Sequence, residues 1–152
     1  LVRQKTKKPI IPKLAPNVPD IGAFAQVAEK AGADALAIMN SFPAMGIDIK
    51  TRKPVLANGS GGLSGPAIKP IAIKLVHDAA QKTNLPIIGM GGIFELEDAI
   101  EFFIAGASAI AIGTANFIDP STSIRVIEGI ETFLIEQGLN DIKKLVGTVN
   151  YG

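Results

Sequence analysis

Residues 105–112 read AGASAIAI, and residues 31–38 carry nearly the same string, AGADALAI. An amphipathic stretch precedes each string, and Pro-Ile-Ile precedes that stretch in both places, at residues 86–88 and 9–11. The repeated unit is therefore strand, helix, turn and strand, and the Ala-Gly-Ala turn is small enough for helix and strand to pack closely. A strand–helix unit that recurs along a chain favours a (βα) barrel over a doubly wound sheet.

The hydrophobicity pattern extends this interpretation to the whole chain. Short β-branched runs alternate with longer amphipathic stretches, as in a parallel α/β sheet with crossover helices. The apolar runs are continuous, which indicates strands covered on both faces. We expect strands at residues 10–14, 35–39, 87–90 and 109–112, and helices at residues 21–31, 67–82, 96–105, 122–136 and 141–146. Four strands make half of a barrel, because a complete one takes ~250 residues.

Length and composition limit the class of protein. The chain has 152 residues, of which 47% are hydrophobic, with 15 basic and 14 acidic side chains. These values predict one domain over residues 1–152 and exclude a disordered chain. A net charge of +1 gives no reason to expect nucleic acid as a partner. The absence of cysteine excludes thiolate metal sites and a cysteine nucleophile within these residues, and no other pattern predicts a metal site.

No targeting or membrane segment is visible. The longest uncharged apolar run, residues 102–118, is shorter than the ~20 residues of a spanning helix. The basic residues 1–8 lack the apolar stretch of a signal peptide. We therefore expect a cytoplasmic protein that does not bind membranes. Because the first residue is Leu1 rather than Met, we also expect a piece of something longer.

Polar residues follow the first two predicted strands, at the end where barrels carry their active sites. Lys13 is a charge inside an apolar strand, either snorkelling to water or fixed beside an anionic ligand. Asn40 and Ser41 either cap a turn or hold a planar polar substrate. The insertion at about residues 41–66 is rich in glycine and proline, as functional or mobile loops often are.

Glycines follow the last two predicted strands. Gly91 and Gly92 come after one strand, and Gly113 and Thr114 after the next. Bare backbone N–H groups at neighbouring strand ends favour an anion site, and barrels frequently bind phosphate after their last two strands. The single histidine, His77, is expected to be an exposed residue in the middle of a helix.

Five strings together resemble class 1B dihydroorotate dehydrogenases from about residue 9 onward. They are KLAPN at 13–17, NS at 40–41, GGLSGPAIKP at 61–70, GMGG at 89–92 and GTANF at 113–117. The resemblance implies a flavin-binding (βα)8 TIM barrel, of which this chain carries the C-terminal half, strands five to eight. It also implies oxidation of dihydroorotate to orotate in pyrimidine biosynthesis, with FMN as hydride acceptor.

The same resemblance implies roles for single residues. Lys13 stabilises the reduced flavin, Met39 touches the flavin through its backbone, and Asn40 and Ser41 bind the orotate ring. The remaining contacts to FMN are expected from Gly65, Gly91, Gly92, Gly113 and Thr114. The implied partners are a subunit carrying FAD and an iron–sulfur cluster, which passes electrons to NAD, and further copies of this chain in a homo-oligomer.

Two departures from the family pattern matter. Ser41 stands where the family usually has threonine, although the hydroxyl is kept. The family's catalytic base is a cysteine on a loop after strand four, and this chain has no cysteine. We therefore expect no catalytic residue in this chain, with the base in a missing N-terminal half. Two alternatives stay open, another flavin enzyme such as a dihydropyrimidine dehydrogenase flavin domain, and a half-barrel that binds phosphate without catalysis.

Overall fold

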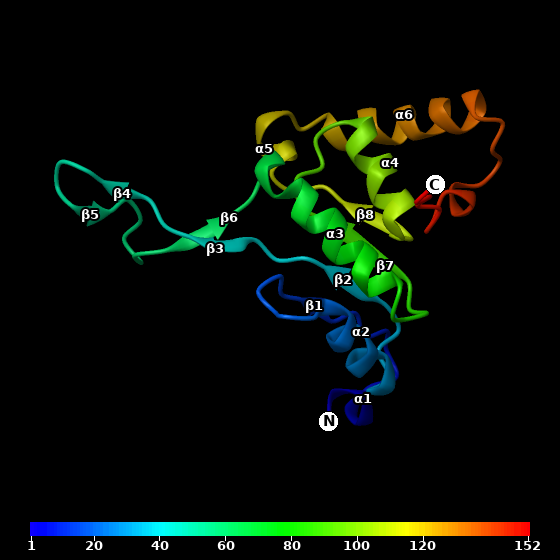
Figure 1. Ribbon diagram of the computed structural model, residues 1–152, viewed down its shortest axis with the longest axis horizontal. Coiled ribbons are helices and arrows are strands. Elements are labelled where there is room, and N and C mark those ends of the chain that lie inside the picture. Colours follow the sequence, from blue (N-terminus) through cyan, green and yellow to red (C-terminus); the bar gives the residue numbers. More distant parts are fainter.

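A four-stranded parallel sheet organises the fold, which a computed structural model describes over residues 1–152 (Figure 1). The sheet has the order β1-β2-β7-β8, and every neighbouring pair is parallel. Its strands are β1 (Lys13–Leu14), β2 (Leu36–Ile38), β7 (Ile87–Met90) and β8 (Ala109–Ala111). All four lie where the sequence predicts strands, so the expected parallel α/β class is confirmed.

The connections between these strands are helical. They are α2 (Ile21–Lys30), the 3₁₀ turn η1 (Pro66–Ile68) continued by α3 (Lys69–Ala80), and α4 (Leu96–Ala105), with α6 (Thr122–Glu136) after the last strand. Helices α2, α3, α4 and α6 contact one another in that order. The Asp20 carboxylate accepts the N–H of Ala23 and begins α2. Gly106, with φ of 122°, ends α4.

Side chains alternate between the two faces of this sheet. Leu36, Ile38 and Ile87 point to the helix side, where each is at most 1% exposed. Four residues in register with one another lie on the opposite face: Lys13, Ala37, Ile88 and Ala109. Of these, Lys13 and Ala109 are exposed. The expectation that both faces are covered is therefore wrong for Lys13 and Ala109, because only one face meets the helices of this chain, whereas Ala37 is buried.

The helix-facing side of the sheet is closely packed at Gly89. A Cβ atom on this residue would lie 2.5 Å from Cδ1 of Phe102 and 3.1 Å from Cβ of Ala107. Phe102 is fully buried in α4 and belongs to the main hydrophobic cluster. The missing side chain of Gly89 is thus what brings α4 against β7.

Prolines explain two differences from the predicted boundaries. The strand expected from residue 10 begins at Lys13, after Pro12, which has no N–H for the ladder. The helix expected over residues 67–82 is divided into η1 and α3. In a continuous α-helix the N–H of residue 70 would donate to the carbonyl oxygen of Pro66, but Pro70 has no N–H. The Pro66 carbonyl oxygen instead accepts the N–H of Lys69, three residues along the chain, which is the 3₁₀ pattern. The helix expected at 141–146 is a single 3₁₀ turn, η2 (Ile142–Lys144).

The insertion at 41–66, expected as a loop, is instead an arm of two antiparallel ribbons that projects from the body (Figure 1). One ribbon pairs β3 (Phe42–Ala44) with β6 (Gly61–Leu63), and the other pairs β4 (Ile47–Asp48) with β5 (Lys53–Pro54). Asp48 Oδ1 accepts the N–H groups of Lys50 and Thr51 at 2.8 and 2.9 Å and forms the turn at the tip. An aspartate that accepts backbone N–H groups two and three residues ahead favours a tight turn, and the glycine and proline content of the insertion does not reveal such a turn.

Two short helices were not expected, α1 (Val2–Lys5) and α5 (Ala115–Ile118). Helix α5 follows β8 directly and turns the chain back toward α6. None of the helices combines the length and hydrophobicity needed to cross a membrane.

The contact at Gly89 leads to a stability prediction. We expect Gly89→Val to lower the free energy of unfolding by about 1–3 kcal/mol, because Phe102 and Ala107 have to move away from β7. The control is Gly113→Val, since a Cβ at Gly113 meets nothing within 4 Å. Thermal unfolding followed by circular dichroism compares both variants with the unchanged protein. Equal midpoints for the two variants would show that Gly89 does not control helix packing.

Candidate functional site

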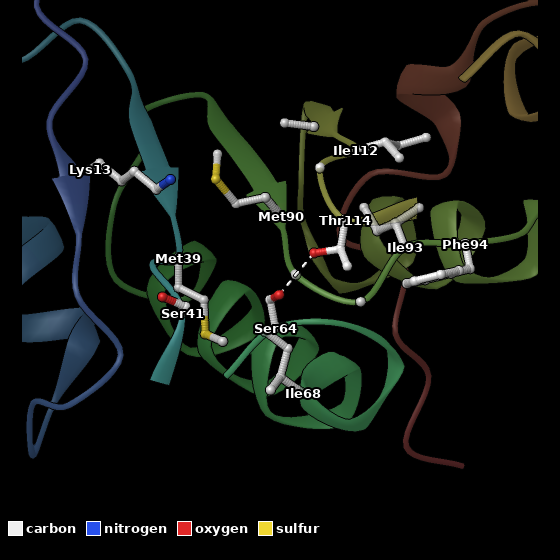
Figure 2. Close-up of a pocket in the computed structure, with 14 residues that line it drawn as sticks. Lys13, Met39, Ser41, Ser64, Ile68, Met90, Ile93, Phe94, Ile112 and Thr114 are labelled. Carbon is white, nitrogen blue, oxygen red and sulfur yellow. Dashed lines mark hydrogen bonds between the residues drawn. The ribbon is translucent and has the colours of Figure 1, made fainter. Parts of the chain in front are cut away.

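A cleft of about 430 Å³ opens at the carboxyl ends of the four parallel strands (Figure 2). All four strands contribute, because the parallel register brings their ends to one edge of the sheet. The cleft mixes apolar side chains from the strand ends and η1 with backbone and hydroxyl groups. Such a lining suits a ligand with an apolar body and a polar end.

Glycine backbone forms one wall of the cleft. Gly91 and Gly92 follow β7 with φ values of 124° and 79°, a region that other residues rarely adopt. A Cβ on Gly92 would lie 2.8 Å from Cβ of Lys69 and 2.9 Å from the Gly65 carbonyl oxygen. Gly91 and Gly92 are therefore pressed against α3 and present only backbone to the cleft.

The adjacent wall comes from the end of β8. Gly113 lines the cleft, and a Cβ at this position would enter open space. Beside it, the Thr114 hydroxyl donates a hydrogen bond to Ser64 Oγ at 2.9 Å, across the cleft (Figure 2). Ser64 stands at the base of the arm, so this bond ties the arm to the glycine wall.

The opposite side holds the cation and the polar residues of the first two strands. Lys13 directs its side chain from β1 toward the cleft, with Met39 and Ser41 near the end of β2 (Figure 2). The peptide bond between Ile38 and Met39 is cis. No acidic residue lines the cleft. Its charge is therefore positive, which favours an anionic ligand.

Seven of the nine predicted site residues line this cleft. They are Lys13, Met39, Ser41, Gly91, Gly92, Gly113 and Thr114. The other two adjoin lining residues without lining the cleft themselves. Asn40 is exposed between Met39 and Ser41, and Gly65 is buried, with its carbonyl beside Gly92.

Several lining residues were not predicted. Ser64 lies within GGLSGPAIKP and could have been found from that string, because a hydroxyl in a glycine-rich loop can bind a ligand through hydrogen bonds. Ile68, Met90, Phe94 and Ile112 are apolar, and their spacing carries no signal that separates a cleft wall from core. The structure holds no group of three or more side chains arranged to bind a metal ion.

His77 lies outside the cleft but is more enclosed than expected. It is half-buried in α3, where Nδ1 lies 3.3 Å from the Ala105 carbonyl oxygen and Nε2 lies 2.6 Å from the Tyr151 hydroxyl oxygen. The packing of α3 on α4 causes this burial. The prediction of an exposed residue is therefore wrong, whereas the prediction of a mid-helix position is confirmed.

An ion pair lies behind the glycine wall. Lys69 Nζ is 2.7 Å from Asp98 Oδ1 and 3.1 Å from Glu101 Oε1. The hydrogen bond to Asp98 raises the pKa of Lys69 despite its partial burial. Burial alone acts to raise the pKa of Asp98, but hydrogen bonds from Lys69 and two backbone N–H groups outweigh it and lower that pKa. Both groups are therefore charged at neutral pH.

Comparison with known proteins identifies the family of this chain. The sequence profile described as "Dihydroorotate dehydrogenase" matches residues 1–134. The chain belongs to the dihydroorotate dehydrogenase family.

Curated relatives carry one name, "Dihydroorotate dehydrogenase B (NAD(+)), catalytic subunit". The relative from Caldicellulosiruptor saccharolyticus is 56% identical over 149 residues, covering 98% of this chain and 50% of that protein. The relative from Thermodesulfovibrio yellowstonii is 52% identical over 97% of this chain and 48% of its own length. The relative from Geotalea uraniireducens is 50% identical over 98% of this chain and 49% of its own length. The chain thus spans about half the length of these dihydroorotate dehydrogenases.

The ion pair gives this dihydroorotate dehydrogenase family member a testable dependence on pH. Because the pKa of Asp98 is lower folded than unfolded, its contribution to stability is present at neutral pH and is lost as pH falls through the folded pKa. We expect Asp98→Asn to cost about 1–3 kcal/mol at neutral pH and less under acid conditions, so that its stability changes less between about pH 5 and pH 3.

The matched control is Asp78→Asn, which removes a more exposed ion pair with Lys74 on the outside of α3. Such surface pairs contribute about 0–1 kcal/mol, so this variant is expected to follow the unchanged protein. Urea unfolding at several pH values measures both. Parallel pH curves for Asp98→Asn and the unchanged protein would contradict the assigned role of Asp98.

Proposed function

We propose that this chain is the C-terminal half, strands five to eight, of a flavin-binding (βα)8 barrel that oxidises dihydroorotate to orotate in pyrimidine biosynthesis. The observation that carries the proposal is the cleft itself, in which a glycine wall, a hydroxyl pair and a single lysine face one another. The names of the relatives supply the reaction, and they favour it over the dihydropyrimidine dehydrogenase alternative.

The open side of the sheet supports the half-barrel part of the proposal. β1 and β8 each pair on one side only, and the face carrying Lys13, Ile88 and Ala109 is incompletely covered. In a closed barrel, strands of the other half would pair with these edges, and layers of side chains would fill the interior. The relatives, which are about twice as long, have enough chain to supply the other strands.

The residues of the cleft fit FMN. The backbone at Gly91, Gly92 and Gly113 is free of side chains, which lets a phosphate approach its N–H groups closely. The Thr114 hydroxyl, now bonded to Ser64, can donate to a phosphate oxygen. We propose that Gly65 and the backbone of Met39 complete the contacts to the cofactor.

When bound, FMN would accept the hydride from the substrate. Lys13 would hold a positive charge in the cleft where negative charge develops during that transfer. Asn40 and Ser41 would orient the planar pyrimidine ring through amide and hydroxyl hydrogen bonds. The chain has no cysteine, so we propose that the proton acceptor lies in the remainder of the subunit.

The names of the relatives support part of the proposed set of partners. "Catalytic subunit" and "NAD(+)" support a second subunit that passes electrons from this protein to NAD. That this subunit carries FAD and an iron–sulfur cluster is a proposal that rests on the sequence resemblance alone. We propose a cytoplasmic homo-oligomer of the catalytic subunit as the working form. In the experiments below, the complete subunit is the polypeptide that joins these residues to the rest of the barrel.

The phosphate wall is tested at Gly113. In the complete subunit, we expect Gly113→Val to weaken FMN binding by about tenfold or more, because the new side chain occupies the space proposed for the phosphate. Gly46→Val in the arm is the control, since a Cβ there meets only the side chain of Val55. Flavin fluorescence titration measures both affinities. Unchanged FMN binding by a folded Gly113→Val protein would contradict the proposed phosphate site.

The role of the cation is tested at Lys13. We expect Lys13→Ala to slow flavin reduction by dihydroorotate about a hundredfold, as the loss of a preorganised charge does, while FMN affinity changes much less. Lys13→Arg keeps the charge and should recover part of the rate. Stopped-flow absorbance of the flavin band follows the half-reaction. An unchanged reduction rate would contradict this role and indicate that the Lys13 ammonium is only solvated by water.

A further inference from the structure

We propose that the Lys69–Asp98 ion pair is a clamp that positions the backbone of residues 91–94 for the phosphate group of the ligand. The inference rests on the proposed function, since it concerns the same cleft. Neither Lys69 nor Asp98 lines the cleft. They are therefore positioning residues, which act through the loop that they hold.

The first contact of the clamp is at the start of the loop. Gly92 lies so close to Lys69 that a Cβ would come within 2.9 Å of its backbone nitrogen and 2.8 Å of its Cβ. Gly91 also lies close to α3, because a Cβ there would be 3.1 Å from Cβ of Ala72. The first turn of α3 thus supports the two glycines from behind.

The second contact is at the end of the loop. Asp98 Oδ2 accepts the N–H of Phe94 at 2.8 Å and that of Glu95 at 3.0 Å. These bonds fix the path of the chain as it leaves the cleft and enters α4. Phe94 itself lines the cleft, so its backbone cannot shift without changing the cleft wall.

The ion pair joins these two contacts. Asp98 Oδ1 receives Lys69 Nζ at 2.7 Å, while its other oxygen holds the loop. The side chains of Lys69 and Asp98 are 26% and 15% exposed, so water screens their attraction less than that of a surface pair. Glu101 gives the ammonium a second acceptor at 3.1 Å and keeps it on the α4 side.

A glycine loop needs such external support. Gly91 and Gly92 have no side chains to fix their own conformation, and glycine is the residue with the largest backbone freedom. N–H groups that converge on a phosphate bind it well only if they are oriented before it arrives. The clamp supplies that orientation from residues outside the cleft.

A purely structural role predicts a different outcome. Helices α3 and α4 already pack through apolar residues, among them Ala72, Val76 and Phe102. If the ion pair only joined the helices, its loss would weaken every ligand of the cleft equally. A clamp on the loop instead affects the phosphate group, so FMN and riboflavin, which lacks the phosphate, separate the two roles.

The experiment uses the complete subunit with Lys69→Met, Asp98→Asn and the double variant. Each is titrated with FMN and with riboflavin. We expect FMN to bind about tenfold more weakly to each single variant, with riboflavin affinity unchanged within about twofold. The double variant should be no weaker than either single variant, because both remove the same contact. Lys69→Arg should keep most of the FMN affinity.

Two variants guard against misfolding and surface effects. Asp98→Asn keeps an oxygen that can accept the backbone N–H groups, so it tests the charge with little change of shape. Lys74→Met removes the exposed ion pair with Asp78, farther along α3, and should leave both affinities unchanged.

Each result decides between the possibilities. Equal losses of FMN and riboflavin affinity, or no loss at all, would overturn the clamp. Loss of FMN affinity alone supports it. If the unchanged subunit itself binds FMN no better than riboflavin, the proposed phosphate site is wrong and the clamp falls with it. That outcome is recognised before any variant is made.

Discussion

The parallel register of the four strands is the constraint on which this structure depends. β1, β2, β7 and β8 run in one direction, so their carboxyl ends meet at one edge of the sheet. Each strand is only two to four residues long. The residue that follows β2, β7 or β8 lines the cleft, whereas β1 contributes Lys13 from within the strand. The parallel arrangement therefore brings polar and glycine residues that lie far apart in the sequence to the same cleft.

Close packing on the helix side controls the shape of that edge. Because Gly89 has no side chain, Phe102 can pack against its backbone. The loop that follows β7 packs against α3 at Gly91 and Gly92. A loop held this way presents backbone to the cleft and apolar side chains to the core. The ion pair between Lys69 and Asp98 adds a polar contact at the same junction.

The two faces of the sheet serve different purposes. The helix-facing side chains form the core of this chain, whereas those opposite, including Lys13 and Met90, contribute to the cleft or remain partly exposed. A lysine can occupy a strand here because its ammonium reaches the open end of the sheet rather than the core. The proposed reaction uses that position, since a cation beside an apolar wall interacts strongly with developing negative charge.

The sequence by itself determined the strand–helix repeat, the parallel sheet and half of the residues that line the cleft. Hydrophobic period, the Ala-Gly-Ala turns and the glycine pairs are local signals, and strand ends share one edge in any such sheet. Only the tertiary structure decided what depends on contacts between distant segments. The arm pairs residues 42–44 with 61–63, His77 is enclosed by α4 and Tyr151, and Lys69 meets Asp98 across 29 positions. Side-chain type does not encode such partners, because they are set by the crossing of whole helices and ribbons.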